Sequence, residues 1–255
     1  MKVIDCFIFY NELNMLELRL EELHETVDLF VLVESTKTFA GKQKELLFNI
    51  NRARFSKHLD KIIHVVVDDM PEDDNPWVLE HFQRNAIQRG IERIDLQDDD
   101  IIMITDLDEI PDSDTVSQFK NSGLTQPVSL DMDLYYYNFT CKMGRTWELP
   151  KAIPFGHYKT DLFPENWRHK SCHLVPRGGW HLSYFGTSDF ICNKITSFSH
   201  QEYNNPAYNS KELIEDQMSK CEDPYRRDYV KISYVALEDN PYLPNNYKLF
   251  KTQDV

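Results

Sequence analysis

The sequence predicts an α/β protein with a mostly parallel central sheet. Short apolar runs alternate with amphipathic segments of helical periodicity through the first half of the chain, and each apolar run ends in polar or turn residues. Strands that are separated by helices need crossover connections, which leave neighbouring strands parallel. No repeat, low-complexity stretch or linker divides the sequence, so we expect a single domain over residues 1–255.

The first half is expected to contain four strands and two helices. Leucines at helical spacing predict a helix over residues 12–24, and a second helix is expected from Trp77 to about residue 91, after an acidic loop. Buried strands are predicted by four apolar runs, at residues 3–10, 28–35, 61–67 and 101–105.

The second half is less regular. Apolar and polar residues alternate over 127–139, which predicts a strand with two different faces, whereas residues 140–176 have no clear pattern. Residues 178–186 are interpreted as a glycine turn, a short strand and another turn. A helix is expected to follow with Ser188 as its N-cap, and the tail from Asn209 is expected to form two amphipathic helical segments.

Composition and charge exclude several classes of protein. Apolar residues make up 41% of the 255 residues and charged residues 27%, which is typical of a soluble globular protein. The 28 Lys and Arg residues against 42 Asp and Glu residues give a net charge of −14, so the chain would repel nucleic acid, and an anionic ligand would need a mediating cation. No apolar run is long enough to span a membrane.

Targeting signals and cysteines point to the cytoplasm. The N-terminal segment has neither the long apolar region nor the cleavage site of a signal peptide, so a cytoplasmic location is expected. The five cysteines are an odd number and form no CxxC pair, so they are expected to be reduced thiols in a reducing compartment: Cys6, Cys141, Cys172, Cys192 and Cys221.

Acidic residues follow the predicted strands at the edge where ligands of parallel sheets bind. Glu34, Asp68 and Asp106 each end or follow an apolar run. Asp106 and Asp108 alternate after the fourth run, with Glu109 beside them. Paired carboxylates at a strand end are hard oxygen ligands that suit Mg²⁺ or Mn²⁺, although a solvated acidic turn is the alternative. Such a metal could neutralise a diphosphate leaving group.

Four segments together resemble glycosyltransferase family 17: VESTKTFAGKQK (33–44), ITDLDEIP (104–111), GGWHLSYFG (178–186) and SFSHQE (197–202). The resemblance implies a GT-A-type, Rossmann-like fold and an inverting transferase. It also implies a UDP-sugar donor that carries GlcNAc, a carbohydrate acceptor, and Mn²⁺ or Mg²⁺. Residues 1–111 would then form the nucleotide-binding half, 112–203 the acceptor and catalytic half, and 204–255 a helical tail.

The resemblance also implies roles for single residues at the donor. Asp106 and Asp108 would form the Asp-x-Asp motif that binds the metal and the donor, and His200, or alternatively His181, would be a further metal ligand. Arg84 could reach the nucleotide or its phosphates, or could only pair with Glu80 within its helix. Tyr10, Asn11 and Glu34 would lie near the nucleotide.

Catalytic and acceptor-binding residues are expected in the second half. The resemblance implies a base at the start of a helix after a glycine loop, which would be Asp189, although an acid at a helix N-terminus also stabilises the helix dipole; Glu202 and Glu148 are the alternatives. Trp180 and Tyr184 are expected to bind the acceptor, with neighbouring aromatic residues. A loop that closes over the donor could carry the basic cluster of Arg168, His169, Lys170 and Arg177, or the cluster could simply be solvated.

Two other functions are compatible with the same residues. A metal-dependent phosphohydrolase would use Asp106 as its nucleophile, but Ile110 stands where such enzymes have Thr or Val, and the motif follows the fourth strand instead of the first. A non-catalytic carbohydrate-binding module could keep a transferase fold. Retention of the acidic residues together with His200 argues against such a module.

Overall fold

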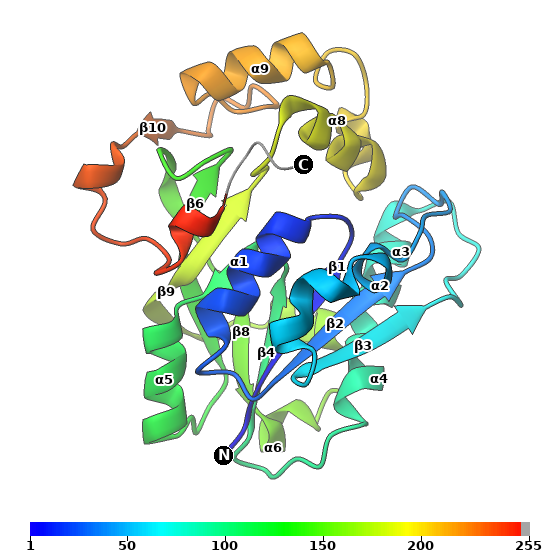
Figure 1. Cartoon of the computed structure of the whole chain (residues 1–255), viewed down its shortest axis with the longest axis vertical. Helices are drawn as coiled ribbons and strands as arrows, with labels where there is room; N and C mark the ends of the chain where they lie inside the picture. The colour runs from blue at the N-terminus through cyan, green and yellow to red at the C-terminus, as the bar shows by residue number, and fades with distance from the viewer. Residues whose placement is uncertain (251–255) are drawn as a thin grey trace.

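The computed structural model describes residues 1–250 and contains one mixed sheet (Figure 1). Its main strand order is β10-β7-β6-β8-β4-β1-β2-β3, and β9 pairs with both β5 and β6. The strands are β1 (Val3–Phe9), β2 (Leu29–Ser35), β3 (Ile62–Val67), β4 (Ile101–Asp106), β5 (Glu109–Pro111), β6 (Val128–Tyr136), β7 (Cys141–Trp147), β8 (Lys151–Pro154), β9 (His173–Ser183) and β10 (Ile232–Tyr234).

Nine α-helices and four short 3₁₀ helices accompany the sheet among residues 1–250. The α-helices are α1 (Leu13–Leu23), α2 (Leu47–Ile50), α3 (Pro76–Asn85), α4 (Ile87–Ile91), α5 (Ser113–Ser122), α6 (Phe155–Tyr158), α7 (Pro164–Arg168), α8 (Ser188–Ser197) and α9 (Lys211–Lys220). Short 3₁₀ helices are η1 (Arg52–His58), η2 (Gln201–Tyr203), η3 (Leu237–Asp239) and η4 (Tyr247–Leu249).

The α/β class predicted from the sequence is confirmed. Strands β3, β2, β1 and β4 are parallel neighbours, as expected from the alternation of strands and helices. Their register aligns Phe9 with Glu34 and Ile8 with Asp106, so the carboxyl ends of three strands lie at one edge. In the second half, β6 and β9 are parallel, whereas β7 and β8 pair antiparallel with their neighbours.

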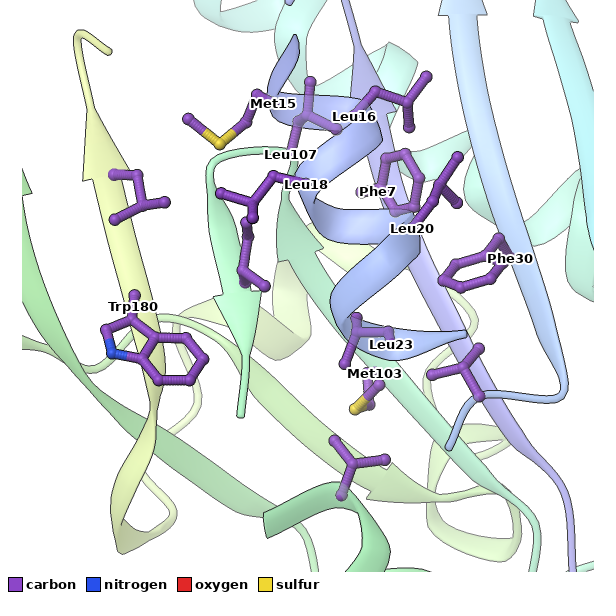
Figure 2. Packing of buried hydrophobic residues seen from close by; sticks show 14 of the residues in the cluster. Phe7, Met15, Leu16, Leu18, Leu20, Leu23, Phe30, Met103, Leu107 and Trp180 are labelled. Atoms are coloured by element: carbon purple, nitrogen blue, oxygen red, sulfur yellow. The ribbon is translucent and has the colours of Figure 1, made fainter. Parts of the chain in front are cut away.

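Alternating side chains of the parallel strands build a core on each face of the sheet. Phe7, Phe30 and Met103 pack against the leucines of α1 (Figure 2). The intervening residues, such as Val31 and Ile104, pack on the opposite face with α3 and α4. Burial on both faces explains why these strands are continuous apolar runs in the sequence.

Three local predictions need correction. The helix expected from Trp77 to residue 91 is divided at Ala86 into α3 and α4. The glycine turn expected at 178–179 is part of the eleven-residue strand β9. Gly179 has φ of +139°, and a Cβ there would lie 2.1 Å from the carbonyl oxygen of Ile110, so this glycine permits close approach of β5. The N-cap of α8 is Thr187, not Ser188.

The tail also differs from its prediction. Between residues 209 and 250 the structure describes one α-helix, α9, where two helical segments were expected, and β10 adds to the edge of the sheet beside β7. The predicted helical tail over 204–255 includes residues 251–255, which lie outside the described residues.

The prediction that all five cysteines are reduced is wrong for two of them. Cys141 of β7 and Cys221 at the end of α9 form a disulfide, with Cα atoms 5.2 Å apart. Their separation of 80 residues hid this pairing, because only the fold brings them together. Disulfides are rare in reducing compartments, so the cysteines no longer argue for such a compartment.

One buried ion pair joins the core to the strand ends. The guanidinium of Arg19 on α1 donates to both carboxylate oxygens of Asp5, at 2.7 and 2.6 Å. It also donates to the backbone carbonyl oxygens of Asp106, Leu107 and Glu109, at 2.8, 3.0 and 2.8 Å. Neither charged side chain is exposed to solvent. Arg19 therefore supports the Asp-x-Asp loop from inside the protein.

We predict that Arg19→Met lowers the free energy of unfolding by about 3–5 kcal/mol, because it leaves Asp5 charged and buried without its partner. Urea denaturation measures this loss. Arg54→Met is the matched control, since Arg54 pairs with Glu17 at the surface and should cost at most about 1 kcal/mol. Equal losses in the two variants would contradict the assigned role of Arg19.

Candidate active site

A cavity of about 570 Å³ opens at the carboxyl ends of β1 and β4. Residues from both halves of the chain line it, including parts of β1, α3, the Asp-x-Asp loop, β9 and α8. Seven Lys and Arg residues line the cavity against five Asp and Glu residues, although the whole chain carries a charge of −14. The cavity is thus a locally cationic site in an acidic protein, which suits an anionic ligand.

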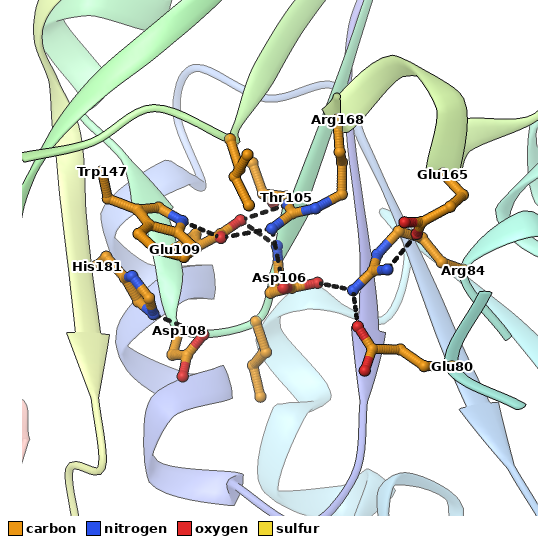
Figure 3. Close-up of polar contacts among 12 residues, drawn as sticks. Glu80, Arg84, Thr105, Asp106, Asp108, Glu109, Trp147, Glu165, Arg168 and His181 are labelled. Carbon is orange, nitrogen blue, oxygen red and sulfur yellow. Dashed lines mark hydrogen bonds and ion pairs between the residues drawn. The ribbon is translucent and has the colours of Figure 1, made fainter. Parts of the chain in front are cut away.

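Asp106 lies between two arginines (Figure 3). Arg84 donates to its Oδ1 atom at 3.0 Å, and Arg168 donates to its Oδ2 atom at 3.1 Å. Removal from water alone would raise the pKa of Asp106, but the guanidinium groups of Arg168 and Arg84 hold it well below its usual range. Asp106 is therefore ionised, and both of its oxygens already have partners.

Glu109 fixes the same loop from the other side. Its buried carboxylate accepts two bonds from Arg168, both at 2.7 Å, and one from the indole of Trp147 at 2.5 Å. It also accepts the backbone N–H of Asp106 at 2.6 Å (Figure 3). Because all four donors converge on Glu109, this residue holds the loop and Arg168 in place and is not free for a ligand.

Arg84 joins α3 to this network. It pairs with Glu80 at 2.7 Å, one helical turn away, and also with Asp106 and Glu165. The intrahelical pair with Glu80, one of the two alternatives for Arg84, is confirmed, and the guanidinium also reaches the Asp-x-Asp motif. Contact of Arg84 with a nucleotide stays a prediction.

Asp108 faces a lysine and a histidine. Lys194 of α8 donates to its Oδ2 atom at 2.9 Å and lies 3.4 Å from Glu12. The Nε2 atom of His181 lies 3.7 Å from Oδ1 of Asp108. Removal from water alone would raise the pKa of Asp108, but Lys194 and then His181 lower it. Burial alone would lower the pKa of Lys194, but Asp108 and Glu12 raise it, so Lys194 is charged.

Strand pairing explains how His181 reaches Asp108. Strands β5 and β9 are antiparallel, with Glu109 opposite His181, and the N–H of Leu182 donates to the carbonyl oxygen of Asp108 at 2.7 Å. The Nδ1 atom of His181 is buried and has no hydrogen-bond partner among residues 1–250. His181 is thereby positioned with Nε2 toward the carboxylate (Figure 3).

The donor atoms at Asp108 fit a divalent metal ion in part. A gap of 3.7 Å between Oδ1 and Nε2 is too long for a hydrogen bond. Adjacent ligands of an octahedral ion with bonds of about 2.1 Å lie roughly 3.0 Å apart, so the two atoms would move closer together to share one ion. Within the described part of the chain, no cluster of three or more His, Cys, Asp or Glu side chains could hold a metal ion. Mg²⁺-type sites commonly use one or two protein ligands together with substrate phosphates and water.

Several residues singled out in the sequence line this cavity: Tyr10, Arg84, Asp106, Asp108, His181, Tyr184 and His200. The hydroxyl of Tyr10 contacts Asn193 and Ser197, both at 2.9 Å, which joins the end of β1 to α8. His200 lies on the far wall, where its Nδ1 atom is 2.7 Å from Glu202 and its ring packs against Trp77.

Other predicted residues lie away from the cavity lining. Asn11 contacts Asn193 beside the cavity, at 3.2 Å. Glu34 is fully buried behind the strand ends, where it bonds His64 and the N–H of Phe48, each at 3.1 Å. Lys44 lines the cavity and lies 3.5 Å from Glu34, so Glu34 can act on a ligand only through such a neighbour.

The expected catalytic acids need correction. The side chain of Asp189 is 72% exposed and pairs with Lys211 of α9 at 2.6 Å, on the outside of α8. A first-turn position on α8 directs it toward α9 instead of the cavity. Glu202 pairs with His200 but is itself exposed and outside the lining, and Glu148 is exposed as well. None of the three is placed to act as a base in this cavity.

The expected acceptor residue Trp180 also needs correction. It is 2% exposed, its indole donates to the carbonyl oxygen of Tyr242, and it packs in the core on the α1 face of the sheet. Its neighbour in sequence, His181, faces the cavity because alternate residues of β9 point to opposite faces. Within the basic cluster Arg168 and His169 line the cavity, whereas Lys170 and Arg177 do not.

Sequence reasoning missed several cavity residues: Glu12, Glu165 and Lys194. Glu12 directly follows Tyr10 and Asn11, so the strand-end argument that selected those two residues could have included it. Lys194 lies in the middle of a predicted helix and gave no signal, because its role depends on the contact of α8 with the Asp-x-Asp loop.

Comparison with known proteins places this site in a family. The profile of glycosyltransferase family 17 matches residues 1–234. The chain is similar to β-1,4-mannosyl-glycoprotein 4-β-N-acetylglucosaminyltransferases: 31% identical to the rat protein over 234 residues, and 30% identical to the mouse protein over 235 residues. Each alignment covers 79% of this chain and 44% of the relative. The human protein is 31% identical over 155 residues, 58% of this chain and 29% of its own length.

The chain thus spans less than half the length of these relatives. No helix among residues 1–250 is long and apolar enough to cross a membrane. The family profile nevertheless covers the entire cavity lining, from Ile8 to Arg227. The chain belongs to glycosyltransferase family 17.

Proposed function

We propose that this chain is a metal-dependent inverting glycosyltransferase with a GT-A-type fold, which moves N-acetylglucosamine from a UDP donor to a carbohydrate acceptor. The observation that carries the proposal is the cationic cavity at the carboxyl edge of the parallel strands. Ligands of open α/β sheets bind at this edge, and a nucleoside diphosphate is an anion that such a cavity would attract. Family membership and the similarity to N-acetylglucosaminyltransferases support the reaction class.

The uridine would lie where the ends of β1 and β2 meet the cavity. Tyr10 and the loop residues Phe39 and Lys44 line this part, and Lys44 lies 5.7 Å from the centre of the Tyr10 ring. The diphosphate would then lie on the side of Asp108 that faces His181, away from Glu12, because inversion needs the base and the leaving group on opposite faces of the sugar. Lys194, which is charged and contacts both Asp108 and Glu12, would lie between the metal site and the base.

Asp108 and His181 would hold the metal ion, with the donor's phosphates and water as the other ligands. Both oxygens of Asp106 are already bonded to arginines, so Asp106 would orient Arg84 and Arg168 instead of binding the metal directly. When bound, the ion would supply positive charge beside the diphosphate leaving group. His200, whose Nδ1 atom already faces Glu202, would remain outside the metal site.

Glu12 is the best-placed base among the cavity carboxylates. Asp106, Glu80 and Glu165 each contact an arginine, and Asp108 contacts Lys194 and His181. Among residues 1–250 Glu12 forms one ion pair, with Lys194 at 3.4 Å, and its other oxygen accepts the N–H of Asn11. In the reaction, the acceptor oxygen would bond to the anomeric carbon and give its proton to Glu12. The bond from that carbon to UDP would break, and UDP would leave with the electron pair.

The phosphohydrolase alternative is not supported by the site. Its nucleophile would be Asp106, but Arg84 and Arg168 each bond one of the two oxygens of that carboxylate. A nucleophile held in this way would have to break one of these bonds before it attacked phosphorus.

We predict that UDP-N-acetylglucosamine stabilises the protein in the presence of Mn²⁺ and not in EDTA. At one hundred times its dissociation constant, a ligand adds about 2.7 kcal/mol to the free energy of unfolding. A thermal-shift panel of UDP-, GDP- and CMP-sugars measures this effect. Stabilisation by none of these sugars with any divalent ion would contradict the proposed donor chemistry.

We predict that Asp108→Asn weakens Mn²⁺ binding in the presence of UDP by at least roughly tenfold, because it removes an anionic ligand. Paramagnetic resonance of free Mn²⁺ measures binding without any turnover. His181→Gln should weaken binding as well. Asp189→Asn is the matched control and should bind Mn²⁺ like the wild type, since Asp189 is exposed and distant from the lining. Normal Mn²⁺ binding by Asp108→Asn would refute the proposed metal ligands.

We predict that Glu12→Gln lowers kcat by about 10²–10⁴-fold, because the amide cannot accept the proton, while UDP binding stays within about twofold. Single-turnover transfer and UDP titration measure the two quantities. If Asp189→Asn lowered kcat instead and Glu12→Gln did not, Glu12 would lose its role as base.

A further inference from the structure

One wall of the cavity is a continuous row of aromatic rings. Successive ring centres lie 4.6, 5.9, 3.7, 6.0 and 5.6 Å apart along the row. All of its rings line the cavity, and in order they are Trp77, His200, Tyr203, Tyr225, Tyr184 and Tyr136. We call this row the aromatic wall.

The aromatic wall runs from solvent into the cavity. Trp77 at its outer end is 38% exposed, whereas Tyr184 near its inner end is 8% exposed. The inner end lies beside the proposed reaction centre, since the ammonium of Lys194 is 5.8 Å from the centre of the Tyr184 ring. A molecule that enters along the wall would therefore approach Glu12 and Asp108, which both contact Lys194.

Two buried tyrosine hydroxyls near the inner end leave one hydrogen-bond donor unused. The hydroxyl oxygens of Tyr184 and Tyr225 are 2.7 Å apart, and neither makes another hydrogen bond among residues 1–250. One phenol hydrogen fills that bond, so the other has no protein acceptor. Burial raises the pKa of both phenols, so both keep their hydrogens. An unused donor in a nearly buried wall is a group ready for a ligand oxygen.

Several contacts hold the aromatic wall in position. Cys221, in a disulfide with Cys141 of β7, fixes the start of the segment that carries Tyr225. Arg227 in the same segment pairs with Asp223 at 2.7 Å and donates to the hydroxyl of Tyr136 at 3.2 Å. The segment is thereby attached both to the sheet and to the wall.

We propose that the aromatic wall is the acceptor subsite and that it binds a pyranose-containing oligosaccharide by stacking. The C–H groups of a pyranose ring form an apolar face that packs on an aromatic ring, while its hydroxyls need nearby polar groups. The wall offers both: its outer rings, Trp77, His200 and Tyr203, are partly exposed and can pack against successive sugars. The free phenol hydrogen at the buried inner end can bond a hydroxyl of the reacting sugar. This inference rests on the proposed transferase function, because the donor defines which end is the reaction centre.

Two variants of the wall test the proposal on the whole chain. Tyr203→Ala removes a stacking ring, and Tyr225→Phe removes only a hydroxyl and so keeps the packing. Tyr234→Ala is the control, because Tyr234 on β10 is 71% exposed and outside the lining. The probe is an array of neutral and acidic oligosaccharides, read for retention of the labelled protein with UDP and Mn²⁺ present. Thermal shift by UDP with Mn²⁺ is measured on the same samples.

We expect wild type and Tyr234→Ala to be retained equally on a subset of the oligosaccharides. Tyr203→Ala should lose about tenfold in apparent affinity, and Tyr225→Phe a smaller factor, with the UDP shift unchanged in both. Equal retention of Tyr203→Ala and Tyr234→Ala, or no retention of the wild type, would overturn the subsite. Retention that depends on Tyr203 without any UDP shift would support the subsite as a sugar site and count against the transferase function.

Discussion

The structure depends on one buried guanidinium, that of Arg19. It neutralises Asp5 inside the sheet and donates to three backbone carbonyl oxygens of the Asp-x-Asp loop. A loop that leaves a strand has carbonyl groups that need partners once they are buried. Arg19 donates hydrogen bonds to these carbonyl groups from the buried side of the loop, so the side chains of Asp106 and Asp108 can face the cavity. The first helix of the chain thus determines the shape of a loop that follows it by more than eighty residues.

The cavity is locally cationic although the whole chain is strongly acidic. A chain with a net charge of −14 must concentrate positive charge wherever it binds an anion. Arg84, Arg168 and Lys194 do so, and each is held by carboxylates that keep it oriented. The carboxylates have a cost, since they reduce the net charge of the cavity, but they fix long side chains that would otherwise lose entropy on binding a ligand.

The sequence predicted features that are local and missed those that depend on long-range contacts. Alternation of strands and helices was enough for β1–β4, and position at a strand end was enough to bring Asp106 and Asp108 to the cavity. The predictions for Asp189 and Trp180 were wrong for another reason. The sequence indicated which helix and strand lie near the cavity, but the face on which each residue lies depends on packing against other elements. The disulfide between Cys141 and Cys221 could not be inferred from spacing at all.

The cavity lies along the seam between the two halves of the chain. Strand β5 continues the Asp-x-Asp loop of the first half, and β9 belongs to the second; their pairing places Glu109 opposite His181. Asp108 then contacts His181 from β9 and Lys194 from the following helix, α8. In the proposed function the nucleotide would lie against the ends of β1 and β4 and the loop after β2, while the segments after α8 carry three of the six rings of the aromatic wall. Since Gly179 permits β5 to approach β9, a side chain at that one position would separate the two sets of residues without changing any of them.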